Sequence, residues 1–253
     1  MLILCAAAAQ AAPVNVTVTI QNLAPANSVS FAPLRLGFGN GSFDSFNTGS
    51  VATAPIVSVA EGGSGVDWFP AFAAAEPGAR LGSVGGELLP GASAMASFVV
   101  DSMLNPFFTF GSMVIPSNDL FIGNDDPMRY RLFDASGTLI LNTINQSVRQ
   151  IWDAGSETAD PANAAFVVGG NNDNRTPQNG VVSFSATELG VFNGLTTAAG
   201  YVFSNAALAA DTNIYRISFA VSAVPEPGSM GLVSAGLFAL GWFCRRRRSA
   251  PIA

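Results

Sequence analysis

The sequence contains no histidine and no lysine among its 253 residues. Histidine is the commonest general base and zinc ligand in proteins, and lysine is required for Schiff-base catalysis. A histidine-based hydrolytic triad is therefore excluded by composition. The two cysteines, Cys5 and Cys244, lie in hydrophobic terminal segments, so the chain between them has neither a disulfide nor a reactive thiol.

Positive charge is also scarce before the C-terminal segment. All of the 17 acidic residues except Glu226 lie within the first 223 residues, whereas four of the 11 basic residues, Arg245–Arg248, follow them. The first 223 residues are therefore acidic and free of lysine, a surface that repels nucleic acid and anionic lipid. It suits a protein that binds cations or one that is simply soluble outside the cell.

The C-terminal segment combines a proline-rich motif, an uncharged run and a basic cluster. Pro225 and Pro227 flank Glu226, and the run Gly228–Cys244 is at the short end of the about 17–25 residues that span a bilayer as a helix. The run predicts a transmembrane helix, and the arginines that follow it predict a cytoplasmic end. Those arginines are Arg245, Arg246, Arg247 and Arg248.

Residues 223–253 resemble the PEP-CTERM sorting tail, which the membrane protease exosortase processes in bacteria that make exopolysaccharide. The resemblance implies an inner-membrane precursor, removal of the tail and sorting to the cell surface or the extracellular space. Two alternatives are an ordinary C-terminal membrane anchor and a core helix of a soluble domain. The core helix is disfavoured because four arginines cannot follow a buried helix without a large desolvation penalty.

The N-terminal segment is consistent with export. Met1–Ala12 is almost wholly apolar and ends in a small-x-small pattern typical of signal peptidase sites. No arginine precedes Arg35, so the predicted signal peptide at residues 1–12 lacks the usual positive region, as a truncated signal peptide would. Between the signal peptide and the tail we expect one domain over residues 13–222.

This domain is predicted to be all-β, an antiparallel β-sandwich, because short strand patterns recur and no helical period is sustained. Val14–Ile20 alternates strictly between apolar and polar residues, as a half-buried strand does. Asp67–Ala75 is the single segment for which we expect a short helix. Further strands are predicted at 94–101, 107–115, 129–134, 138–142, 165–168, 181–184 and 214–221, with a hairpin turn at 135–137.

Two segments place carboxylates in loops beside apolar residues. They are Gly111–Asp125 (GSMVIPSNDLFIGND) and Ile151–Glu157 (IWDAGSE). Calcium takes about 6–8 oxygen ligands, and Asp153 and Glu157 are close enough in sequence to fold back on one ion. Transition metals are disfavoured by the lack of histidine and available cysteine.

Other interpretations of these residues stay open. One alternative is that the aspartates are turn formers that hold no ion. Another is that Asp153 and Glu157 are an acid/base pair of a glycosidase. Trp68 and Trp152 are expected to be core residues rather than platforms on which a ligand stacks.

The same two segments resemble the spondin domain of F-spondin and mindin, whose pattern is close to SMVxPSPDWFVGxD and DAGTDSG. The resemblance implies a β-sandwich like that of calcium-dependent lipid-binding modules, with calcium at one end. By motif position its ligands would be Asp125, Asp153 and Glu157, while Asp119 would stabilise the loop. The family's tryptophan is Leu120 here, and its second loop acid is Glu157 rather than aspartate.

Together these patterns predict an exported, exosortase-sorted surface or matrix protein with a calcium-binding domain and no enzymatic activity. Adhesion or association with exopolysaccharide is the expected role, and nucleic acid is not an expected partner. The alternatives are a carbohydrate-active hydrolase that uses Asp153 and Glu157, and a structural surface protein that binds no ion.

Overall fold

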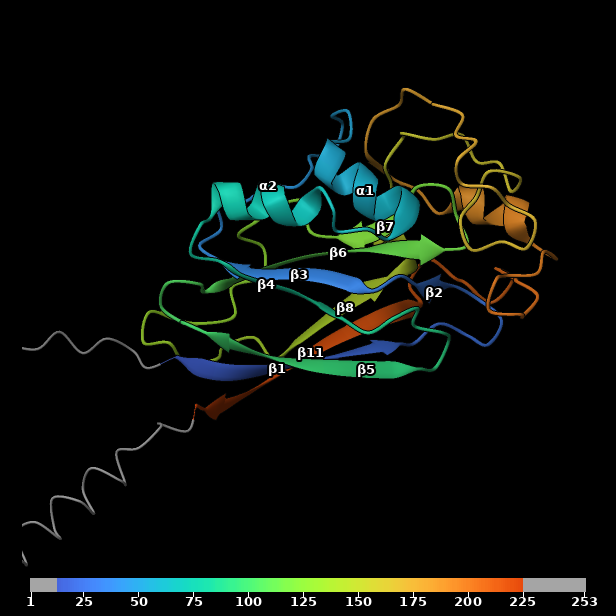
Figure 1. Ribbon diagram of the computed structural model, residues 1–253. Helices are drawn as coiled ribbons and strands as arrows, with labels where there is room; N and C mark the ends of the chain where they lie inside the picture. Colours follow the sequence, from blue (N-terminus) through green and yellow to red (C-terminus); the bar gives the residue numbers. More distant parts are fainter. Residues whose placement is uncertain (1–12, 225–253) are drawn as a thin grey trace, which may run out of the picture. The chain divides into compact units, whose positions relative to one another are not determined.

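The computed structural model describes residues 13–224, in which two antiparallel sheets are stacked and two helices cover the outer face of one of them (Figure 1). The all-β class predicted from the sequence is confirmed. The elements in chain order are β1 Val14–Asn22, β2 Ser30–Phe31, β3 Leu34–Gly39, α1 Ala54–Gly62, α2 Trp68–Ala75, β4 Arg80–Val84, β5 Ser93–Val100, β6 Phe107–Ile115, β7 Leu120–Gly123, β8 Thr143–Ser147, the 3-10 helix η1 Val148–Gln150, β9 Trp152–Asp153, β10 Ser183–Phe184, the 3-10 helix η2 Thr187–Phe192 and β11 Asn213–Ala223.

The first sheet has the strand order β5-β1-β11-β8. Its central strand β1 turns Val16, Val18 and Ile20 inward, and all three side chains are fully buried. Because successive residues of a strand face opposite sides, the strict alternation in the sequence becomes one apolar face and one polar face. β1 pairs with β5 in a register that places Val16 opposite Phe98.

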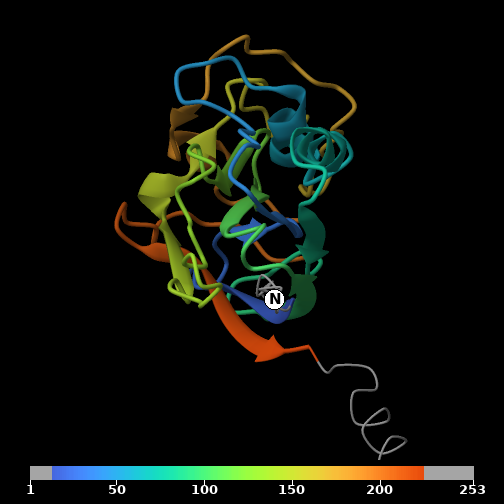
Figure 2. The same ribbon diagram turned by 90° about the vertical axis from the view of Figure 1, so that its left-hand side faces the viewer.

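The second sheet has the strand order β10-β9-β7-β6-β3-β4, and β2 pairs with β6. Its inner face contributes Phe38, Phe108 and Phe110 to the main core between the sheets. On its outer face α1 and α2 cover a second apolar cluster that includes Trp68 and Trp152. Figures 1 and 2 both show the helices on the far side of this sheet from β1 and β5.

Strands covered on both faces do not alternate in burial. Every residue of β6 from Phe108 to Ile115 is buried, which explains its nearly continuous apolar sequence. Trp68 is fully buried and Trp152 is 5% exposed, so both pack in the core cluster as expected.

Several predicted elements are confirmed and others are corrected. The strands at 14–20, 94–101, 107–115 and 214–221 and the helix at 67–75 correspond to β1, β5, β6, β11 and α2. The segments 129–134 and 138–142 form only isolated bridges, such as Phe133 with Leu139, and 165–168 likewise forms two single bridges. Strand propensity alone does not form a ladder where turns interrupt the pairing.

Four expectations lie outside the described residues. They are the signal peptide at 1–12, the motif at 225–227, the helix at 228–244 and the basic cluster at 245–248. Within residues 13–224 no helix has the length and apolar character that crossing a membrane requires.

Candidate metal site

Asp119 lies at the connection between β6 and β7. The Ser117 hydroxyl donates to the carbonyl of Val114 at 2.6 Å and accepts from the backbone N–H of Leu120 at 3.1 Å, which closes the turn tightly. This turn leaves Asp119 fully buried at the start of β7. Its Oδ2 accepts hydrogen bonds from the backbone N–H groups of Ser156 and Glu157, at 2.8 and 3.0 Å. Asp119 therefore ties the β7 turn to the loop after β9.

Asp153 ends the short strand β9, which lies between β7 and β10. It is paired with Leu120 on one side and with Ser183 on the other. Its Oδ1 accepts a hydrogen bond from the backbone N–H of Gly155 at 2.6 Å. Gly155 has a φ of +65°, and a Cβ there would lie 2.7 Å from the backbone nitrogen of Val181. Only glycine allows this turn to fold so closely against the neighbouring chain.

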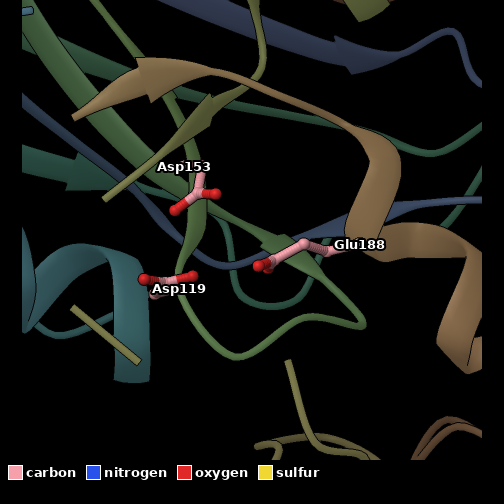
Figure 3. Close-up of side chains that lie close together, drawn as sticks. All are labelled: Asp119, Asp153 and Glu188. Carbon is pink, nitrogen blue, oxygen red and sulfur yellow. The ribbon is translucent and has the colours of Figure 1, made fainter. Parts of the chain in front are cut away.

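Glu188 reaches the same place from η2, which follows β10 along the chain. The pairing of β10 with β9 brings η2 beside Asp153 although 34 residues separate the two acids in the sequence. One carboxylate oxygen from each of Asp119, Asp153 and Glu188 lies within 4.8 Å of the others. Figure 3 shows the three carboxylates converging from separate segments.

Burial raises the pKa of all three carboxyl groups, and neighbouring acidic charges raise it further for Asp119 and Glu188. Burial, together with the charge on Asp153, raises the pKa of Asp119 to about 6. The backbone hydrogen bonds from Glu157 and Ser156 act in the opposite direction. Burial, followed by the charges of Asp153, Asp119 and Glu157, raises the pKa of Glu188 to about 8. The pKa of Asp153 is also raised by burial. Ionising the whole group is therefore unfavourable unless a cation is present.

Two oxygens of the cluster have no hydrogen-bond partner although they are buried. They are Oδ1 of Asp119 and Oε2 of Glu188. Within residues 13–224 the ion pairs join Arg149 to Asp211 and Arg175 to Glu61, so neither arginine neutralises the cluster. An all-oxygen set of carboxylates without a protein cation has the donor chemistry that Ca²⁺ prefers.

The structure separates the ligands predicted from the sequence. Asp153 belongs to the cluster, whereas Asp125 follows the opposite end of β7 from Asp119. At about 3.3 Å per strand residue, the length of β7 is too great for Asp125 to share an ion with Asp119. Asp125 instead accepts a hydrogen bond from the Thr48 hydroxyl at 2.7 Å.

Glu157 lies next to the cluster but outside the converging group. It is 1% exposed, its Oε1 accepts from the Asn118 amide at 3.1 Å, and its Oε2 has no partner. Burial and the neighbouring charges of Asp119 and Asp160 raise its pKa, although its bond to Asn118 works against this. Glu157 is therefore a fourth buried or partly buried carboxyl group at this end of the sheet.

Sequence reasoning missed Glu188 as a candidate ligand. It occurs in the segment TELGVF, which has no loop motif and no glycine-flanked aspartate to mark it. The pairing of β10 with β9 was the missing information, and a strand of two residues gives almost no periodicity to detect.

Comparison with known proteins identifies one segment. Residues 223–248 match the family model of the PEP-CTERM protein-sorting motif. No curated protein matches the chain in sequence. The match covers the tail alone, so the resemblance of the domain to spondin stays a prediction. The chain therefore carries a PEP-CTERM sorting motif, which implies processing by exosortase, export and sorting to the cell surface.

Proposed function

We propose that the exported domain binds calcium through Asp119, Asp153 and Glu188. In this proposal it acts at the cell surface in adhesion or in association with exopolysaccharide, without enzymatic activity. The buried Oδ1 of Asp119 carries the calcium assignment, because this oxygen has no partner and belongs to a converging set of carboxylates. A buried acceptor without a donor is destabilising unless a ligand completes it.

The chemistry of the surrounding chain supports a hard cation. The domain offers no histidine and, between its hydrophobic ends, no cysteine. Calcium accepts carboxylate oxygens with irregular geometry, whereas magnesium demands a near-octahedral shell and keeps several waters. Glu157 and backbone carbonyls of the same loops are the nearest additional sources of oxygen. The resemblance to spondin also implies calcium at one end of the sandwich, but of the ligands that it implies only Asp153 belongs to this cluster.

A hydrolytic role for Asp153 and Glu157 gains no support. These side chains are 8% and 1% exposed, so they do not present a pair of carboxylates to a polysaccharide chain. Glycosidases need both groups beside the scissile bond of a bound sugar. We therefore propose a binding role rather than a catalytic one.

The calcium proposal is tested by thermal unfolding of the full chain in mild detergent. At about 100-fold excess over the dissociation constant, calcium should stabilise the domain by about 2.7 kcal/mol. The melting temperature should rise in millimolar calcium, rise less in magnesium and return with chelator. Asp119→Asn should abolish most of the rise.

Asp125→Asn is the matched control for this experiment. It removes one carboxylate beyond the opposite end of β7, outside the cluster, so the calcium response should persist. A response lost in Asp125→Asn and kept in Asp119→Asn would favour the ligand set implied by the spondin motifs. A melting temperature indifferent to calcium would leave the aspartates as turn formers.

For the tail, we propose an inner-membrane precursor that exosortase processes. Replacing residues 225–227 with alanine should leave full-length protein in the inner membrane of a host that has exosortase. The intact mass of the wild-type surface form should lack Arg245–Arg248. A surface form that retains these arginines would show that the tail is an ordinary anchor.

A further inference from the structure

A second feature lies at the edge of the sandwich, away from the carboxylate cluster. It is a cavity of about 290 Å³ between β8 of the first sheet and β9 and β10 of the second. Gln146, Trp152, Phe184 and Arg129 contribute to its walls, and Asp119, Asp153 and Glu188 do not. This volume is close to the lower end of ligand pockets, about 300 Å³. We call it the Trp152 pocket.

One wall of the Trp152 pocket is a rigid aromatic face. The rings of Trp152 and Phe184 stack with their centroids 3.7 Å apart and an interplanar angle of 28°. Trp152 is held from behind by Phe46, whose ring centroid lies 5.0 Å away. Phe184 is nevertheless 56% exposed. A flat apolar ring that is braced by packing and open to solvent suits a ligand with a flat apolar face.

The floor of the pocket is polar. The Gln146 amide Nε2 donates to the Tyr130 hydroxyl at 3.0 Å, while Gln146 itself is 1% exposed. Its Oε1 has no partner. If the side-chain amide of Gln146 were flipped, its oxygen would face Tyr130 and its nitrogen would be the atom without a partner. The floor therefore has hydrogen-bonding capacity that the protein does not use.

The rim offers donors and acceptors side by side. The Thr48 hydroxyl holds one oxygen of Asp125, and the Asn124 amide donates to the carbonyl of Asp126 at 3.0 Å, which orders this loop. The two aspartates outnumber the one arginine of the pocket, Arg129, so an anionic ligand is disfavoured. Carboxylate, amide and guanidinium groups all bind hydroxyls.

We propose that the Trp152 pocket binds a neutral pyranose unit of a polysaccharide. The C–H face of the sugar ring packs on the exposed side of Phe184, which Trp152 supports from behind, and its hydroxyls bind Asp125, Arg129 and the Gln146–Tyr130 pair. This inference rests on the surface role proposed above but not on the calcium site. Trp152 and Asp153 are neighbours on β9, and their side chains leave opposite faces of that strand.

The test is titration of the full chain in mild detergent with neutral hexasaccharides of glucose, galactose and mannose, followed by tryptophan fluorescence. Oligogalacturonate of the same length is the anionic comparison. We expect at least one neutral oligosaccharide to bind and oligogalacturonate to bind at least tenfold more weakly. Phe184→Ala should weaken neutral binding at least tenfold, and Asp125→Ala should weaken it severalfold.

Val202→Ala is the matched control, because Val202 is 54% exposed and does not line the pocket. Val202→Ala should leave binding unchanged, and all variants should unfold cooperatively and only above the temperature of the titration. Absence of binding by every neutral oligosaccharide, or binding that Phe184→Ala does not change, would overturn the proposal. Preference for oligogalacturonate would overturn the neutral assignment. The titration is repeated with chelator. Sugar binding that is unchanged without calcium would show that the pocket proposal stands or fails separately from the calcium site.

Discussion

Two buried carboxylate regions of this domain are built in opposite ways. Glu76, at the end of α2, is 3% exposed and accepts hydrogen bonds from the backbone N–H groups of Asn40, Ser42 and Phe43. The cluster of Asp119, Asp153 and Glu188 brings three carboxylates together and contains two buried oxygens without partners. Glu76 therefore stabilises a loop through protein donors alone, whereas in the calcium proposal a cation compensates the cluster.

The ion pair between Glu61 and Arg175 strengthens the contrast. Glu61 is 4% exposed and contacts the guanidinium of Arg175. This domain thus supplies donors or a positive charge for two of its buried acids and leaves a third group uncompensated. Converging buried carboxylates whose pKa values are raised by burial and by one another's charge are typical of functional sites.

The largest effect is expected at Glu76. Glu76→Gln replaces one carboxylate oxygen by an NH₂ group that faces backbone donors, and it weakens the remaining charge-assisted bonds. We expect a loss of about 3 kcal/mol in the free energy of unfolding, measured by urea denaturation. A loss below about 0.5 kcal/mol would show that the N–H groups of the loop do not depend on this carboxylate.

Gly155→Ala tests the backbone that positions the cluster. The new Cβ would lie 2.7 Å from the Val181 nitrogen in a residue with φ of +65°. We expect a loss of about 2 kcal/mol and a weaker calcium response. Gly190→Ala is the control, because a Cβ there meets no atom within 4 Å and Gly190 has no positive φ. Equal behaviour of the two variants would contradict the close packing of this turn.

Glu188→Gln should change stability in the direction opposite to Glu76→Gln. It removes a charge that the neighbouring acids disfavour, so the calcium-free chain should gain about 1 kcal/mol at pH 9, allowing for the partial exposure of Glu188. Such a gain corresponds to about 2–4 °C in melting temperature. Destabilisation of calcium-free protein at pH 9 would show that Glu188 is already compensated.

The pH dependence of stability gives a smaller and graded test. The folded-state pKa values of Asp119 and Glu188 are raised to about 6 and about 8. The folded chain therefore binds more protons than the unfolded chain between about pH 4 and 8. Without calcium, their contribution to stability is present below pH 4 and is lost as the pH rises to 8. In thermal melts of Glu188→Gln, the melting temperature should not show this decrease above pH 6.

The sequence predicted the parts of the fold whose pattern is local. β1 and β11 alternate over several residues, and β6 is a long apolar run. α1 was not predicted, because it is short, has a proline in its first turn and carries no period long enough to detect. β3 contains two glycines, which obscure the strand propensity of Leu34–Gly39.

The candidate site was only partly predictable for a related reason. Asp153 was identified because DAGSE is a local motif, and its turn depends on Gly155. Asp125 was grouped with it because both follow apolar segments, but the length of β7 separates them. Glu188 joins the cluster through the pairing of Ser183 with Asp153, a tertiary contact that no local pattern records.

Calcium binding to the cluster is the central claim, and titration calorimetry of the full chain at pH 7.5 tests it most directly. We expect about one calcium per chain, with a dissociation constant of about 10⁻⁴–10⁻³ M, as in other extracellular modules. Because the pKa of Glu188 is raised to about 8, binding should release protons, and the heat should change with the ionisation enthalpy of the buffer. Asp153→Asn should lose the binding. No heat at calcium concentrations well above a millimolar, or unchanged heat in Asp153→Asn, would contradict the claim.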